Sequence, residues 1–276
     1  MLFYETLLNG KFVPVTLEGK NPRERFTDWM LLEQPFISSP IEGGMKQAQE
    51  KLKALDFSAY HKTRNYLDGA VSGLSPYIEH GLIQPDEVLK FIDTNNARIE
   101  AYHFLQQLSW RAFFEQKYLE DPSLIWKDAG EYKTGFTAAD YADVMPDDII
   151  KGQTPVAVIN QFIEELYQTG YLHNHARLYL AAYVVHWRRV KWQAGAKWML
   201  SHLLDGNLAS NNYSWQWVAS TGSTKPYIFN LDNVIEFANQ KYKTQRTLNV
   251  DIDKSYETLK QQLFPQIVES QNEKGH

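Results

Sequence analysis

The chain has 276 residues, of which 43% are hydrophobic and 14% aromatic, so it is long and apolar enough to fold around a full core. Its net charge of −5 excludes a global basic field for nucleic acid, and any such surface must be local. The absence of cysteine excludes disulfides, cysteine nucleophiles and thiolate-held zinc or iron–sulfur centres. No signal-peptide pattern and no apolar run of about 18 residues occurs, so we expect a soluble cytoplasmic protein without a membrane partner.

The N-terminal third is predicted to change from an irregular leader to helices. Residues 1–40 are expected to pack on the domain as a leader with one hairpin, because Asn9-Gly10 separates two short apolar runs. Helical spacing begins after Ile41, and Pro85 with the acids that follow it marks a helix start. The predicted helices are 43–55, 57–64, a piece opening at Leu74, one starting at Gln84, and 96–118 with an apolar stripe of Ile99, Tyr102, Leu105 and Leu108.

The rest of the chain is predicted to be helical as well. Residues 121–154 form a polar excursion with short helices, and Gly170 is placed to end the helix before it. Because period-2 alternation is almost absent beyond the hairpin, the fold class is predicted to be all-α, with one domain over 41–265 and a disordered tail over 266–276. The further predicted helices are 155–168, 173–192, 194–204 after a break near Gly195, 211–220, 233–242 and 254–263.

The segment from Leu166 to Asn230 has an unusual charge pattern. Asp205 is its only acidic residue, against six lysines and arginines. A semi-buried carboxylate in a basic segment needs a partner, and Arg177 offers a bidentate fork. The pair is either a brace between two helices or part of a polar site. Likewise, Asn174, Asn207 and Asn211 either cap helices or read the edge of a heterocycle.

The same segment holds five of the eight tryptophans. Trp187 and Trp198 are predicted to pack in the core, whereas Trp215 and Trp217 flank Gln216 and are harder to assign to packing alone. Aromatic rings beside basic residues can stack on bases or pass electrons. His173 and His175 are two apart on a helix and point to different faces, so no metal site is expected. The Rossmann and Walker A motifs are absent, as are HExxH and GxSxG.

Four blocks in order resemble the FAD-binding helical half of DNA photolyases and cryptochromes. They are YHKTRNYLDGAVSGLSPYIEHG from Tyr60, QLSWRAFF from Gln107, GYLHNHARL from Gly170 and DGNLASNNYSWQWVASTGS from Asp205. Each block alone is a weak signal, but the four together are highly specific. The resemblance implies an all-helical domain with FAD as its cofactor and without the α/β antenna domain.

The resemblance also implies which residues hold FAD. The turn near Ser72 and Ser75 falls where the family holds the phosphates. Asp205 and Asn207 would face the polar edge of the flavin, and Asn211 would face its N5 atom. The full cofactor set is Tyr60, Val71, Ser72, Gly73, Leu74, Ser75, Gln107, Arg111, Asn174, Arg177, Asp205, Gly206, Asn207 and Asn211.

The implied chemistry is light-driven electron transfer. Trp215 and Trp192 match the first two members of the chain that photoreduces the flavin, and the third is either Tyr141 or Trp126. With Asn211 and Gln107, these two tryptophans form the catalytic set. The set implied to contact DNA or the lesion is Arg64, Trp110, Asn174, His175, Leu178 and Trp217, with a basic rim from Arg64, Arg188, Arg189 and Lys191.

Several positions depart from the family pattern. Val71 stands for Thr, Gln107 for Glu, Asn207 for Asp and Leu178 for Met, and the loop TGSTKPYIFN lacks an arginine for phosphate. The expected function is photorepair of UV pyrimidine dimers, with single-stranded DNA preferred because the footprint is small. The alternative is a cryptochrome-like flavin sensor or redox protein that does not repair DNA, to which the missing antenna, Gln107 and Leu178 point.

Overall fold

The computed structural model describes residues 39–95 and 97–267. Helices build these residues, and the single β contact found among them is a parallel bridge between Ala142 and Val190. The predicted all-α class is therefore confirmed. The chain divides into two units, Met1–Ile41 and Glu42–His276, and the described helices belong to the second. The hairpin predicted around Asn9-Gly10 and most of the predicted tail lie outside the described residues.

The first helices of this unit begin where the sequence predicts. Asp56 caps α4, its Oδ1 accepting from the Ala59 amide at 2.9 Å. The amide of Gln84, which precedes Pro85, donates to the Glu87 carboxylate at 2.7 Å and so closes the start of α6. The helices are α3 (Met45–Lys53), α4 (Phe57–Thr63), α5 (Ser75–Glu79), α6 (Pro85–Thr94) and α7 (Tyr102–Glu120).

Helix α7 begins six residues later than the predicted start at 96, and the predicted apolar stripe is wrong at its beginning. Ile99 lies in a turn with 87% of its surface exposed, and Tyr102 is also exposed. The buried residue is Phe104, whose ring packs against those of Phe57 and Tyr60 at 5.7 and 5.4 Å. Because α7 contacts α4 at one end and α12 along its length, no single stripe of α7 faces a core.

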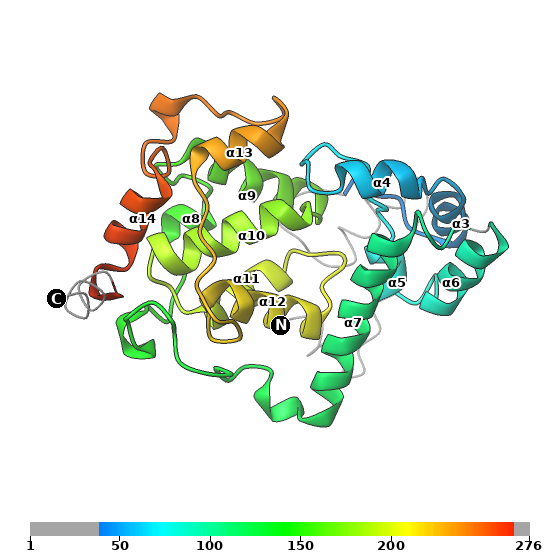
Figure 1. The fold of residues 1–276 in the computed structure, drawn as a ribbon, viewed down its shortest axis with the longest axis horizontal. Helices are drawn as coiled ribbons and strands as arrows, with labels where there is room; N and C mark the ends of the chain where they lie inside the picture. Colours follow the sequence, from blue (N-terminus) through cyan, green and yellow to red (C-terminus); the bar gives the residue numbers. More distant parts are fainter. Residues whose placement is uncertain (1–38, 96, 268–276) are drawn as a thin grey trace, which may run out of the picture. The chain divides into compact units, whose positions relative to one another are not determined.

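The C-terminal part follows the predicted order (Figure 1). Gly170, with φ +65°, ends α9 as expected. The predicted polar excursion contains only short helices: η1 (Pro122–Leu124), η2 (Ala138–Asp140) and α8 (Asp147–Ile150). The remaining elements are α9 (Ala157–Thr169), α10 (Asn174–Ala182), η3 (Tyr183–Trp187), α11 (Trp192–Leu200), α12 (Leu208–Ala219), α13 (Leu231–Ala238), η4 (Arg246–Leu248) and α14 (Tyr256–Leu263).

Two predictions about helix breaks in this part are wrong. The helix predicted over 173–192 ends its α-helical part at Ala182, continues as the π-helical turn η3, and breaks at Arg189, whose φ is +51°. The break predicted near Gly195 does not occur, because α11 runs straight through this glycine. A Cβ at position 195 would lie 2.4 Å from the Trp215 ring, so the glycine gives close packing rather than a helix end.

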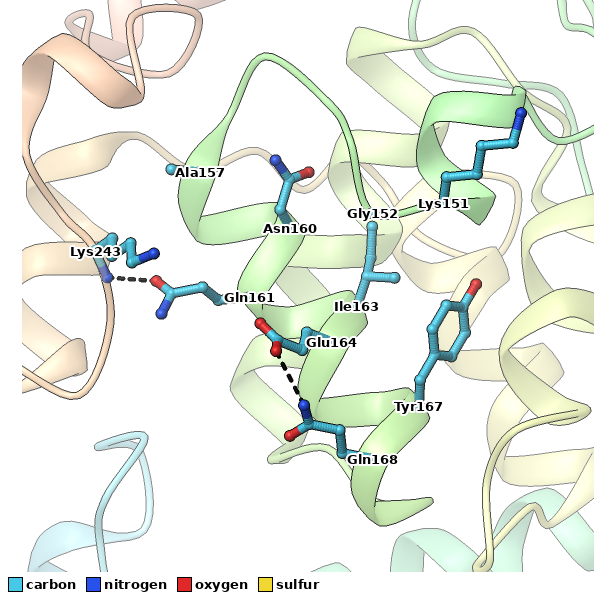
Figure 2. Close-up of a pocket in the computed structure, with 10 residues that line it drawn as sticks. All are labelled: Lys151, Gly152, Ala157, Asn160, Gln161, Ile163, Glu164, Tyr167, Gln168 and Lys243. Atoms are coloured by element: carbon cyan, nitrogen blue, oxygen red, sulfur yellow. Dashed lines mark hydrogen bonds between the residues drawn. The ribbon is translucent and has the colours of Figure 1, made fainter. Parts of the chain in front are cut away.

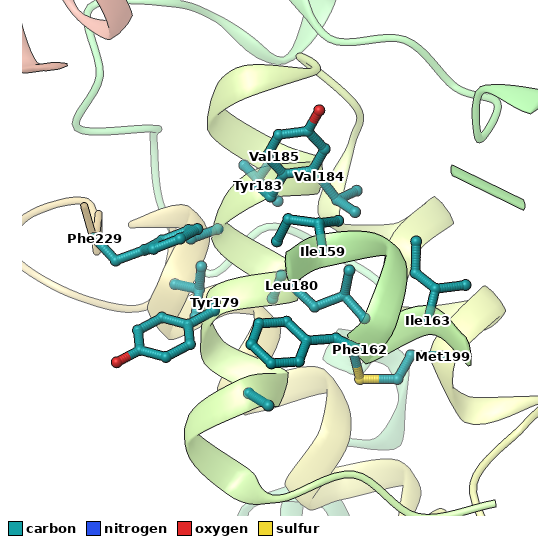
Figure 3. Packing of buried hydrophobic residues seen from close by; sticks show 14 of the residues in the cluster. Ile159, Phe162, Ile163, Tyr179, Leu180, Tyr183, Val184, Val185, Met199 and Phe229 are labelled. Carbon is teal, nitrogen blue, oxygen red and sulfur yellow. The ribbon is translucent and has the colours of Figure 1, made fainter. Parts of the chain in front are cut away.

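The core lies between α9, α10 with η3, and the helices that follow (Figure 3). Ile159, Phe162 and Ile163 of α9 meet Tyr179 and Leu180 of α10, all of them fully buried. This packing fixes α10, whose first residues carry the candidate site. Trp187 and Trp198 are partly buried against the same cluster, as predicted. None of the described helices has the length and apolar character needed to cross a membrane.

Candidate functional site

A cavity of about 380 Å³ opens between two groups of helices. Its walls come from α4, α5 and α7 on one side and from α10 and the start of α12 on the other. A narrower cavity of about 100 Å³ shares six lining residues with it and continues towards Asn211 and Trp215. The shared residues are Asn174, Arg177, Leu178, Asp205, Asn207 and Ser210, so the two cavities adjoin each other at these residues.

Asp205 and Arg177 form a buried ion pair where the cavities meet. Arg177 Nη2 lies 2.8 Å from both oxygens of Asp205, whose side chain is only 3% exposed. The predicted two-nitrogen fork is not formed, because Arg177 Nε donates instead to the Leu172 carbonyl at 2.7 Å. Burial lowers the pKa of the Arg177 guanidinium, but the charge and hydrogen bond of Asp205 raise this pKa by more.

Ser75 gives the Asp205 carboxylate a further hydrogen bond. Its hydroxyl donates to Asp205 Oδ2 at 2.6 Å, across 130 positions of sequence. Two residues earlier, the turn depends on Gly73, whose φ of +61° favours glycine. The Leu74 amide donates to Ser72 Oγ at 3.3 Å in the same turn. Val71, Ser72, Leu74 and Ser75 line the larger cavity, whereas Gly73 shapes the turn from behind.

Asn207 caps helix α12 and so confirms one of the two interpretations that the sequence leaves open for it. Its Oδ1 accepts from the Ser210 amide at 2.8 Å, and its Nδ2 donates to Glu115 Oε1 at 3.1 Å. Both ends of this amide therefore bond to protein groups. Gly206, just before it, lines neither cavity, and a Cβ there would lie 3.1 Å from the Leu203 carbonyl oxygen.

Arg111 lines the larger cavity but is held by two carboxylates. Its Nη2 lies 2.6 Å from Glu79 Oε2 and 3.0 Å from Glu115 Oε1. A phosphate beside Arg111 would therefore meet a guanidinium that is already neutralised. Tyr60 and Gln107 line the same cavity, from α4 and α7.

Asn211 has an unused polar atom beside the narrower cavity, which Ser210 also lines. Asn211 Nδ2 donates to the Ala196 carbonyl at 3.2 Å and to Asn212 Oδ1 at 3.0 Å, while its own Oδ1 has no partner among the described residues. The buried Ser210 hydroxyl also lacks a partner within that part of the chain. The amide oxygen of Asn211 beside this cavity can therefore accept a hydrogen bond from a ligand with polar edges, as a flavin has.

Trp215 lines the narrower cavity, and Trp192 lies on the neighbouring helix α11. Trp215 packs against Gly195, one turn from Trp192 on α11, and Trp192 is fully buried. Of the two candidates for a third aromatic, Trp126 stacks on Trp192 with ring centroids 6.4 Å apart and planes at 7°. Tyr141 instead stacks on Tyr132 at 4.3 Å.

The residues predicted to contact DNA fall into two groups. Arg64, Asn174, His175 and Leu178 line the larger cavity. Trp110 on α7 and Trp217 on α12 are 50% and 45% exposed and line neither cavity. Their nearest rings are Phe113 and Phe114 for Trp110 and Tyr227 for Trp217.

The basic rim predicted from four cations is wrong for three of them. Arg188 forms a two-nitrogen fork with Asp148 at 2.7 and 2.9 Å, and Lys191 pairs with Asp143 at 2.6 Å. The third, Arg189, donates to the Leu263 carbonyl and lies 3.7 Å from the centre of the Phe136 ring. These charges are held by partners from the excursion and the C-terminal region rather than offered to solvent.

Several lining residues were not predicted from the sequence, among them Tyr171, His173 and Ser210. Tyr171 lies 5.3 Å from the Arg177 guanidinium, with its ring beneath the charge. His173 uses its Nδ1 to accept from the His175 amide at the start of α10, and burial lowers the pKa of His173 to about 4. Ser210 directly precedes Asn211. All three lie inside the sequence blocks that resemble photolyases. Their position in these blocks is the sequence signal that could have pointed to them.

A separate cavity of about 430 Å³ lies on the outer side of α9 (Figure 2). Its polar side chains are largely paired with each other or with nearby backbone: Gln168 donates to Glu164 at 2.9 Å, and Gln161 accepts from the Lys243 amide at 2.5 Å. None of the residues predicted for cofactor or DNA lines this cavity.

The helical fold and the polar cavity around a buried ion pair define a cofactor-binding helical domain. The family described as the FAD binding domain of DNA photolyase matches residues 104–248. The chain belongs to this family, and FAD is its cofactor.

Known relatives agree with this assignment. A deoxyribodipyrimidine photo-lyase of Vibrio cholerae is 29% identical over 180 residues, which cover 62% of this chain and 38% of the relative. A class III photolyase structure from Agrobacterium tumefaciens superposes with a TM-score of 0.65 at 20% identity, over 96% of this chain and 61% of that one. A Synechocystis cryptochrome gives a TM-score of 0.64 at 19% identity, over 82% and 46%. The chain spans less than half the length of the curated photolyases it matches.

Proposed function

We propose that this domain uses FAD for light-driven electron transfer that splits pyrimidine dimers in DNA, preferably in single strands. The observation that carries the proposal is the pair of adjoining cavities. Their lining residues extend from the Ser72–Ser75 turn, past the Asp205–Arg177 pair, to Asn211 and Trp215. Reduced FAD supplies an electron when it absorbs light.

The chain's own residues would hold and orient the cofactor. The Ser72–Ser75 turn would hold its phosphates, and the Asp205–Arg177 pair would bind the polar edge of its ring. Asn211 offers its free Oδ1 on the same side as Trp215. Tyr60, Gln107 and the other lining residues of the larger cavity exclude water around it.

The lesion would enter beside the half-exposed indoles of Trp110 and Trp217. Large exposed aromatics on two helices in contact, α7 and α12, suit stacking on an unpaired base. Because Arg188, Arg189 and Lys191 are held by internal partners, few cations remain for phosphates, and the electrostatic part of DNA binding is small. A single strand needs no unpairing, so it should be favoured over a duplex.

The second candidate is a flavin photoreceptor or redox protein without repair activity. The neutralised rim favours it, because a sensor needs no phosphate contacts. Gln107 also favours it, since this residue stands where the family places a carboxylate. Both candidates require the same cofactor cavity, so they differ only in what happens at the DNA face.

A repair assay separates the two candidates. Photoreduced protein would be mixed with a dimer-containing oligonucleotide, single- or double-stranded, in blue light or in darkness. Light-dependent loss of the dimer, faster in the single strand, is the expected result. Trp217→Ala serves as the matched variant, because this exposed side chain contributes little to the core and its loss should slow repair at least tenfold. FAD that photoreduces without any loss of dimer would favour the sensor.

A further inference from the structure

The stacked indoles of Trp126 and Trp192 carry opposite charges beside them. Trp192 Nε1 donates a hydrogen bond to Asp128 Oδ1 at 2.6 Å. The ammonium of Lys197 lies over the Trp126 ring, 5.1 Å from its centroid. Gln193 also donates to Asp128 Oδ1, at 2.9 Å, and helps to hold this carboxylate in place. The two rings are nearly parallel, yet one faces an anion and the other a cation.

These charges decide which ring better tolerates the loss of an electron. A cation is attracted to the face of a neutral indole because the ring is electron-rich. Once the ring is oxidised it becomes positive, so Lys197 repels a positive charge on Trp126, while Asp128 attracts one on Trp192. An oxidised indole is also a far stronger acid at its N–H, and the Trp192 N–H already points at a carboxylate.

Within the light-driven electron transfer proposed above, on which this inference rests, we propose that Trp192 is the final electron donor of the aromatic chain and that Asp128 accepts its proton. Trp215 gives one electron to light-excited FAD, and Trp192 then gives one electron to Trp215. The Trp192 N–H proton moves to Asp128 Oδ1 and, since Asp128 is exposed, onwards to water. A thiol reductant in solution later returns one electron and one proton to Trp192.

The order of the chain follows from α11. The Trp215 ring packs against Gly195 of α11, and Trp192, the fully buried indole of this helix, lies three positions before that glycine. Tyr141 is a poor final donor, because its hydroxyl bonds to Thr134 Oγ1, which is a weak proton acceptor. The guanidinium of Arg189 also lies 5.8 Å from the Tyr141 ring and disfavours positive charge there. Trp126 and Tyr141 are thereby both set aside as the third member.

The test is time-resolved absorption of the full-length protein with bound oxidised FAD after a light flash, in H₂O and D₂O. The spectrum distinguishes a protonated from a neutral indole radical, independently of any repair activity. We expect a neutral radical whose formation slows at least twofold in D₂O. Trp192→Phe should reduce the long-lived radical at least tenfold, whereas Trp126→Phe should leave it within twofold of wild type.

Two variants test the charges of Asp128 and Lys197 without removing an aromatic ring. Asp128→Asn keeps the hydrogen-bond acceptor but not the charge, and should shorten the radical lifetime at least tenfold and abolish the isotope effect. Lys197→Gln should let Trp126 share the radical, so that Trp126→Phe now alters the yield. Asp143→Asn, another exposed aspartate of the excursion, is the matched control and should change nothing.

The outcomes separate the inference from the proposed function. If Trp126→Phe lowers the radical yield as much as Trp192→Phe, or if Asp128→Asn leaves the lifetime and the isotope effect unchanged, the inference is overturned while light-driven electron transfer stands. If the wild-type protein forms no tryptophan radical at all, the inference is overturned, while the repair assay on protein with reduced FAD still decides the proposed function. Melting temperatures of each variant, matched to wild type, guard against loss of fold.

Discussion

Gly195 offers a sharp test of the site because two opposing effects meet at it. It lies inside α11, where an alanine would favour the helix by about 1 kcal/mol. A Cβ at this position would, however, lie 2.4 Å from the Cη2 and Cζ3 atoms of Trp215 and 3.1 Å from Val184 Cγ1, where ordinary contacts are 3.4–4 Å. The two effects predict opposite signs for Gly195→Ala.

The packing effect should be the larger one. The Trp215 ring is 2% exposed and would have to retreat by roughly 1 Å, and overpacking of this kind costs about 1–3 kcal/mol. After the helix gain is subtracted, we expect a net loss of up to about 2 kcal/mol, or a Tm lower by up to about 8 °C. Because the ring also walls the narrower cavity, FAD should bind at least tenfold more weakly.

The assay combines thermal unfolding, flavin titration and a double-mutant cycle. Trp215→Phe removes the outer atoms of the indole, so Gly195→Ala should cost less in that background than in the wild type, with a coupling of about 0.5–3 kcal/mol. A higher Tm for Gly195→Ala with unchanged FAD affinity would refute the placement of the Trp215 ring. Additive effects in the cycle would refute it as well.

Three other changes test the ion pair, a buried histidine and the rim. Asp205→Asn leaves the largely buried Arg177 without its counter-ion. The purified protein should therefore lose its flavin absorbance, and urea unfolding should show a loss of up to about 3 kcal/mol of stability. A fully yellow, equally stable variant would contradict this. Burial lowers the pKa of His186 from 6.5 to about 4, so between these values the unfolded chain binds the extra proton and stability falls as the pH drops. This residue alone should cost about 2 kcal/mol between pH 7 and pH 5, and unfolding of His186→Gln should show a shallower pH dependence; an unchanged slope would argue against the assignment. Asp148→Asn frees Arg188, so single-stranded DNA should bind more tightly, with a salt slope steeper by about 0.7, and an identical slope would place Arg188 out of reach of phosphates.

The centre of the site could be predicted from charge alone. Asp205 is the only acidic residue between Leu166 and Asn230, and a carboxylate in such a segment needs a cation. The structure pairs it with Arg177, as predicted, and adds the Ser75 hydroxyl. The helix start at Gln84 was also readable, because a cap depends on residues only a few positions apart.

What the sequence did not predict comes from contacts between distant segments. Arg188 and Lys191 looked like free cations because their own segment is basic, but Asp148 and Asp143 reach them from the excursion some 40 positions earlier. Gly195 looked like a helix break because the local helix preference of glycine takes no account of the Trp215 ring, which packs against it from α12. Counting the charges within one segment therefore overestimates the electrostatic field that a binding partner such as DNA would meet.

The wide sequence separation within the cofactor cavity has a consequence for biosynthesis. Ser75 bonds to Asp205, and His80 Nε2 lies 2.9 Å from the Leu204 carbonyl oxygen 124 positions later. At ribosomal speed these partners are made on the order of ten seconds apart, so FAD has no finished cavity to enter until nearly the whole domain has emerged. The cofactor then stabilises only chains in which both halves have met, by about 2.7 kcal/mol at a hundredfold excess over Kd. Flavin retention should accordingly act as a quality check on folding, since a fault in either half leaves the protein colourless.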